Sequence, residues 1–203
     1  VMDTVQTRMV YDALVALNVP QDFAPQLQRE MHYMSIMYRA EKRGVLVDER
    51  YTRELQSTLQ HRIDQDLFYL RSKGLDNPNS VDQVVDLLET DYNFVPWEFT
   101  PTGKASLNKN VLAVLALAGG LQTETVEALV RYKRNVKWKG TYVDRFLTSA
   151  DIHGFVHPSI NTMAARTGRS SIQGPPLQTL PSNDPMIRRC LLPPKKHSWY
   201  SLD

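Results

Sequence analysis

A length of 203 residues allows one large domain or two small ones, with enough apolar material for a packed core. Hydrophobic residues make up 42% and charged residues 23%, which excludes a chain that is disordered throughout. The single cysteine, Cys190, excludes an internal disulfide and a cysteine-based zinc cluster, and it fits a reducing cytosol. No apolar run is long enough to span a bilayer and no secretory leader opens the chain, so we expect a cytoplasmic protein with no membrane partner.

The net charge is only +2, but its distribution is uneven. Basic residues gather in 131–145 and again in 166–196, whereas acidic residues gather in 48–98. This asymmetry favours a local contact with a polyanion over a uniformly basic surface. The alternative, that these residues form ordinary solvated helix faces, stays open on charge alone.

The first two thirds of the chain have helical periodicity. Apolar residues at spacings of three and four predict helices over 5–17, over 27–43 with its end at Gly44, and over 51–73. Methionines on the second of these helices are expected to pack in a core, namely Met31, Met34 and Met37. The stripe of the third helix, which follows Asp48 as a capping residue, predicts antiparallel packing against a neighbour.

Three more helices precede a change of pattern in the last quarter of the chain. Short helices are predicted over 81–88 and 109–117, separated by a turn-rich loop, and a longer helix over 123–146 carries most of the first basic cluster. From Gly154 onwards, 155–160 and 198–202 have strand character. The predicted fold is therefore mainly α, followed by an α+β portion with antiparallel strands, with a boundary near 147–155.

The chemically informative segments lie at the end of the chain. The glycine, arginine and serines of 167–171 supply donors that can follow a phosphate backbone or reach a minor groove, and Arg188 can donate bidentately to phosphate. Asp203 ends a mostly apolar strand, where an unpaired carboxylate is costly and Mg²⁺ is a suitable partner. From composition alone, a turn-capping role for Asp203 is the simpler interpretation.

Several segments resemble, in order, the thumb and the beginning of the palm of family A (polymerase I-like) DNA polymerases. The resemblance covers roughly 28–203 and rests on Arg43-Gly44-Val45-Leu46-Val47-Asp48, Thr102-Gly103-Lys104-Ala105-Ser106, Lys137-Trp138-Lys139-Gly140-Thr141-Tyr142, Thr167-Gly168-Arg169-Ser170-Ser171, Leu177-Gln178-Thr179-Leu180-Pro181, Ile187-Arg188 and Asp203. The chain departs from the family's pattern at Thr179, where asparagine is usual, and at Ser170 and Ile172, which replace leucine and serine.

The resemblance implies three regions. Residues 28–150 would be the helical thumb and 151–203 the start of the palm, up to the family's motif A. Residues 1–27 are a candidate end of a 3′–5′ exonuclease-like domain, with Asp3 as a candidate metal ligand. A helix-capping role for Asp3 is the simpler interpretation.

The resemblance also implies a template-directed DNA polymerase. Asp203 would be the first of two catalytic aspartates that hold two Mg²⁺ ions, and Arg188 would lie near the primer end or the phosphates of the incoming deoxynucleoside triphosphate. The residues expected to contact primer–template DNA are Asn79, Ser80, Lys104, Ser106, Lys137, Lys139, Thr141, Tyr142, Asn161, Thr162, Thr167, Gly168, Arg169, Ser171 and Gln178. The fingers and the second aspartate are absent from the sequence, so the sequence is either a truncated chain or one piece of a split polymerase. For a split polymerase we expect the remaining polymerase polypeptide as a partner, in a bacterial or phage-infected cell.

Two other functions are compatible with the residues. A helical nucleic-acid-binding module without catalysis would bind DNA but would need no metal at Asp203. A helical protein–protein adaptor would have no affinity for DNA, whereas thumb-like binding is independent of sequence and falls steeply with salt.

Overall fold

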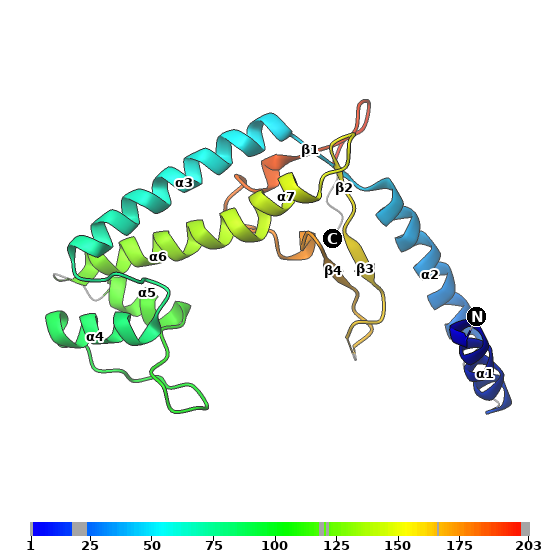
Figure 1. Ribbon diagram of the computed structural model, residues 1–203, viewed down its shortest axis with the longest axis horizontal. Coiled ribbons are helices and arrows are strands. Elements are labelled where there is room, and N and C mark those ends of the chain that lie inside the picture. Colours follow the sequence, from blue (N-terminus) through cyan, green and yellow to red (C-terminus); the bar gives the residue numbers. More distant parts are fainter. Residues whose placement is uncertain (1, 18–23, 118–119, 121, 166, 200–203) are drawn as a thin grey trace.

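The computed structural model describes residues 2–17, 24–117, 120, 122–165 and 167–199. In this part of the chain helices dominate and the strands are short and antiparallel, which confirms the predicted fold class. Figure 1 shows two long helices side by side, with short helices at one end and the strands at the other, where a further helix leads away. Among the described residues, no helix combines the length and the apolar character that a bilayer crossing needs.

Helices α1 (Met2–Ala16) and α2 (Ala24–Arg43) form the part that leads away. Helix α2 ends as predicted at Gly44, which has a φ of 68° and donates its N–H to the carbonyl of Ala40 at 3.0 Å. The prediction that its methionines pack in a core is wrong for the described chain, since Met31 is 59% and Met34 44% exposed. The physical reason is that strand β3 (Ser159–Asn161) is the main described neighbour of α2, so most of its apolar face is left uncovered.

Helices α3 (Glu49–Ser72) and α6 (Gln122–Trp138) run antiparallel and pack along their length, as the apolar stripe predicts (Figure 1). The Asp48 carboxylate accepts the backbone N–H of Tyr51 at 3.0 Å and begins α3. The stripe of α3 is buried and contributes to both core clusters of the molecule. Helices α4 (Val81–Tyr92) and α5 (Lys109–Leu117) close the cluster at the distal end.

The predicted helix over 123–146 is interrupted by one wider turn. Helix α6 continues into the π-helical turn η2 (Lys139–Val143) and then into α7 (Asp144–Ser149). Trp138, Tyr142 and Phe146 are all buried although they are spaced by four residues. In an α-helix with 3.6 residues per turn, side chains spaced by four gradually move around the helix. The π-helical turn contains more residues and so keeps these three side chains on one buried face.

Strand β1 (Val45–Val47) is the centre of a three-stranded sheet, flanked by β2 (Phe155–Val156) and β5 (Leu191–Leu192). The sheet therefore joins three segments that are far apart in sequence. Its pairs are antiparallel, with Val45 opposite Val156 and Val47 opposite Leu191.

The predicted strand over 155–160 is divided at His157-Pro158 into β2 and β3. Proline has no N–H to continue a strand ladder, which accounts for the division. Strand β3 forms a hairpin with β4 (Ser171–Gln173), followed by the short 3₁₀ turns η3 (Leu177–Thr179) and η4 (Arg188–Cys190). The strand predicted over 198–202 lies mostly outside the described residues, and Ser198 and Trp199 belong to no strand.

Candidate nucleic-acid interface

Most of the residues expected to contact DNA fall on three surfaces of the structure, and the others lie in the turns η2 and η3. We call the three surfaces the distal tip (79–82 and 102–106), the α6 groove (the surface between α5, α6 and 181–184) and the hairpin (159–173).

At the distal tip, an ion pair brings two predicted segments together. Lys104 Nζ lies 3.0 Å from Asp82 Oδ2 in the first turn of α4, and both side chains are exposed. Ser80 caps the same helix by accepting the N–H of Gln83 at 3.4 Å, and Asn79 beside it is exposed. Ser106 is half-buried, and its N–H donates to the carbonyl of Glu98 at 2.8 Å. Since an exposed ion pair is worth little, Lys104 can exchange Asp82 for a phosphate at small cost.

The α6 groove has a volume of about 1020 Å³ and joins two sequence segments that were predicted separately. One wall is the basic face of α6, and the opposite wall is the loop that follows Pro181. Its lining residues include Lys109, Arg131, Lys133, Arg134, Lys137, Trp138, Pro181, Ser182, Asn183 and Asp184.

The basic side chains of the α6 groove differ in the groups that they contact. Arg131 is held by Asp66 at 3.0 Å, and Arg134 lies over the ring of Trp138 at 5.0 Å. Burial lowers the pKa of Lys133, so an anion in the groove would stabilise its charged form. For Lys133 and Lys137, the described part of the chain offers no carboxylate within ion-pair distance, which leaves both available to a polyanion.

The π-helical turn directs two predicted DNA contacts inward. Lys139 Nζ lies 3.0 Å from Asp144 Oδ2, and the same carboxylate accepts from Gln56 Nε2 at 2.7 Å. Tyr142 is 2% exposed and its hydroxyl donates to the carbonyl of Thr179 at 2.5 Å. In this conformation Lys139 and Tyr142 hold elements together, whereas the side chain of Lys137 is exposed and Thr141 is half-buried.

The hairpin gathers the remaining predicted contacts. Asn161 and Ser171 are opposite each other in the β3–β4 pair, and the loop between the strands carries Thr167, Gly168 and Arg169. Gly168 has a φ of 72°, a conformation that favours glycine and turns the loop beside the exposed Arg169. Gln178 Nε2 donates to the carbonyl of Ser170 at 3.2 Å and braces the loop from the side.

Two polar residues at the base of the hairpin have internal roles. The Asn161 side chain accepts the N–H of Met163 at 3.0 Å and tightens the first turn of the loop. Thr162 is buried, so its side chain packs inside the protein at the base of the hairpin.

Arg188 and Arg189, which are adjacent in the second basic cluster, have separate neighbours. Arg188 Nε donates to the carbonyl of Pro181 at 2.9 Å and so braces the loop that lines the α6 groove. Arg189 lies over the ring of Tyr51 at 4.8 Å, where it packs against α3.

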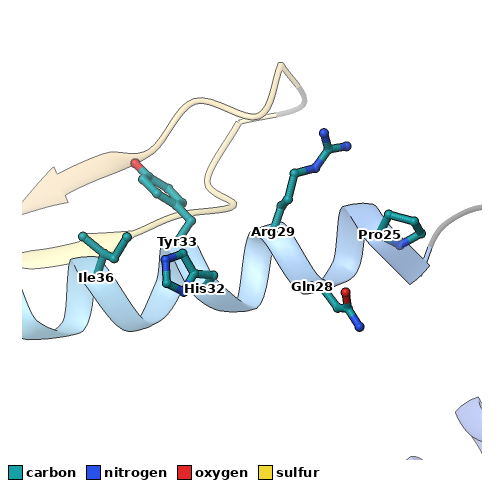
Figure 2. A pocket seen from close by; sticks show the side chains of 6 residues that line it. All are labelled: Pro25, Gln28, Arg29, His32, Tyr33 and Ile36. Atoms are coloured by element: carbon teal, nitrogen blue, oxygen red, sulfur yellow. The ribbon is translucent and has the colours of Figure 1, made fainter.

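A second hollow, of about 580 Å³, lies along α2. Figure 2 shows Arg29 and Tyr33 projecting toward the side on which the hairpin ribbon passes, whereas Gln28 points the other way. The hollow is lined by Pro25, Gln28, Arg29, His32, Tyr33 and Ile36.

Comparison with known proteins decides the family. The sequence model of DNA polymerase family A matches residues 47–203. The chain is 32% identical over 204 residues to the DNA polymerase of Mycobacterium phage D29, covering 100% of this chain and 33% of that protein. It is also 31% identical over 192 residues to the DNA polymerase of Mycobacterium phage L5, covering 94% of this chain and 31% of that protein. The chain belongs to DNA polymerase family A.

A solved structure is similar to this family A chain. The POL domain of Pol1 from M. smegmatis, in complex with a DNA primer-template and dNTP, has a TM-score of 0.67 and 25% sequence identity. The match covers 76% of this chain and 27% of that one. The chain thus spans about a third of the length of the phage relatives that it matches.

The metal ligands expected of a family A enzyme lie beyond what the structure describes. Asp203 is outside the described residues, and the side chain of Asp3 is too, although Asp3 is part of α1. Among the described residues, no three His, Cys, Asp or Glu side chains come together in a way that could hold a metal ion.

Sequence reasoning assigned no individual contacts to Lys133, Arg134 or the loop 181–184. The signal for the first two was the basic cluster of 131–145, of which α6 presents only some members to the groove. No local signal indicated the loop, because its place opposite α6 depends on packing between distant segments.

Proposed function

We propose that this chain binds primer–template DNA as part of a template-directed DNA polymerase and supplies Asp203 as the first catalytic metal-binding aspartate. The observation that carries the proposal is the α6 groove, in which the basic face of α6 meets the segment that follows Leu177–Pro181. The family match and the similarity to a polymerase domain solved with primer-template and dNTP support it. In this proposal, 28–150 is the thumb, 151–203 begins the palm, and 1–27 ends an exonuclease-like domain.

The chemistry of these surfaces suits duplex DNA of any sequence. Each neutralised phosphate releases counterions, and Lys133, Arg134 and Lys137 present cations along one wall of the groove. Arg169 at the hairpin tip supplies donors for the minor groove, where A·T and G·C pairs both present acceptors. A donor there reads the shape of a base pair and not its identity.

The reacting end of the site needs groups outside the described residues. Asp203 is the residue of this chain that would hold Mg²⁺, which when bound neutralises charge on the reacting phosphates. Arg188 is proposed to act beside the primer end or the incoming nucleotide. The rest of the polymerase would supply the fingers and the second aspartate, in the cytoplasm of a bacterial or phage-infected cell.

The test is primer extension by the chain assembled with the remaining polymerase polypeptide, alongside duplex binding by the same preparation. We expect Asp203→Asn to abolish nucleotide addition and to leave duplex affinity within about twofold, because the carboxylate acts on the metal and not on the duplex. Extension by the Asp203→Asn assembly at the normal rate would contradict the metal-ligand assignment. Duplex binding without extension in every assembly would favour the non-catalytic module instead.

A further inference from the structure

A histidine just before the hairpin has oxygen acceptors at both ring nitrogens. His157 Nδ1 lies 2.8 Å from the carbonyl oxygen of Glu41, in the last turn of α2, and Nε2 lies 3.3 Å from Asp151 Oδ2. A neutral imidazole carries one N–H and can donate to only one of these oxygens. The imidazolium donates to both, so this arrangement favours the charged ring.

The two acceptors of the ring raise its pKa, and two weaker effects oppose them. The carbonyl of Glu41 and then the carboxylate of Asp151 raise the pKa of His157, while partial burial and the ammonium of Lys42 on α2 lower it. The Asp151 carboxylate is kept ionised because it accepts the N–H groups of Phe155 at 2.8 Å and His153 at 2.9 Å, which lower its pKa.

Helix α2 contacts the hairpin at a second point, again through Glu41. The Glu41 carboxylate accepts the backbone N–H of Ile160 in β3. At the end of α2, Gly44 lets the imidazole approach closely, since a Cβ there would lie 2.8 Å from the ring of His157. Glu41 therefore holds both the turn before the hairpin and its first strand.

The contacts of Glu41 with His157 and Ile160 lie next to the part of the hairpin that is proposed to bind DNA. Strand β3 leads directly to Asn161 and to the loop that carries Arg169, and β3 is the main described neighbour of α2. A neutral ring can donate either to Glu41 on α2 or to Asp151 in the turn before β2, so deprotonation removes one of the two hydrogen bonds that fix the chain between α2 and the hairpin.

We propose that His157 is a positioning residue for duplex binding, which as an imidazolium fastens the hairpin to the end of α2 and holds Asn161 and Arg169 in their binding orientation. The proposal rests on the proposed function, because it assigns His157 to the same DNA surface. The ligand is duplex DNA, and His157 itself does not contact it.

The direction of the pH effect follows from the geometry. The charged ring is fully present below the usual pKa of imidazole, and its second hydrogen bond is lost as the pH rises through the raised pKa of His157. Duplex affinity should therefore fall as the pH rises through the pKa of His157. The fall should be larger than in a variant that has no titratable group at position 157.

The experiment measures the Kd for a primer–template duplex at constant ionic strength between about pH 5.5 and about pH 8.5. We expect the affinity of the unmodified chain to fall about fivefold with rising pH, and the affinity of His157→Gln to stay nearly flat. His153→Gln is the matched control, because His153 lies in the same turn and contributes only its backbone N–H to Asp151. It should keep the profile of the unmodified chain.

Two measurements without DNA separate this proposal from the proposed function. NMR titration should give His157 a pKa above the usual value for imidazole, and hydrogen exchange at the Ile160 amide should speed up in His157→Gln. A His157→Gln pH profile that matches the unmodified chain, with duplex binding intact, overturns the positioning role and leaves the proposed function standing. Absence of duplex binding at every pH overturns both, whatever the NMR titration shows.

Discussion

Tyr142 shows how one hydroxyl can connect two parts of the molecule. It comes from the π-helical turn, and it donates to Thr179 in the segment that lines the base of the hairpin. The resemblance to family A implied a place beside DNA for Tyr142. Its inward direction was not predictable, because a wider helical turn leaves no trace in the apolar periodicity.

Replacing Tyr142 by phenylalanine keeps the ring and removes the hydroxyl. The carbonyl of Thr179 then loses the donor that the buried Tyr142 supplies, and because Thr179 is exposed, water can replace that donor. We therefore expect the free energy of unfolding to fall by about 0.5–1.5 kcal/mol. Chemical denaturation measures the change. Tyr38→Phe, on the exposed side of α2, is the control and should alter stability by less than about 0.5 kcal/mol. Equal stabilities for the two variants would contradict the structural role of the Tyr142 hydroxyl.

At the scale of elements, the packing of α3 on α6 was predictable and the surroundings of α2 were not. The apolar stripe of α3 is long and regular, so its spacing alone indicates one buried face. Helix α2 has similar apolar content, but periodicity does not say whether a neighbour exists to cover it. That is why Met31 and Met34 were placed in a core that the described chain does not contain.

The α3–α6 contact makes a direct prediction about stability. Leu59 has 0% of its surface exposed, so Leu59→Ala leaves a cavity and should lower the free energy of unfolding by about 2–5 kcal/mol. Phe68 lies on the same helix but is 79% exposed, and Phe68→Ala should cost less than about 0.5 kcal/mol. Both changes are measured by chemical denaturation of the same preparation. A similar loss in both variants would contradict the assignment of the buried face.

At the scale of the whole molecule, the three-stranded sheet is the feature that local sequence patterns could not reveal. It brings β1 between β2 and β5, which come from the other end of the chain. The family motifs placed the basic helix in the thumb and Leu177–Pro181 in the palm, and gave no indication of the loop 181–184. Only the packing of distant segments shows that α6 and this loop line one groove.

The central claim is that the α6 groove binds duplex DNA through its cations. The measurement is the Kd of the chain for a primer–template duplex between about 50 and about 300 mM salt, for the unmodified chain and for the double variant Lys133→Ala with Lys137→Ala. We predict a linear fall of log affinity with log salt, and a slope that is shallower by about two in the double variant, since each lysine neutralises about one phosphate. Arg50→Ala, an exposed residue of α3 that pairs with Glu54, should keep the original slope. Absence of duplex binding, or a double variant with the unmodified slope, would contradict the account.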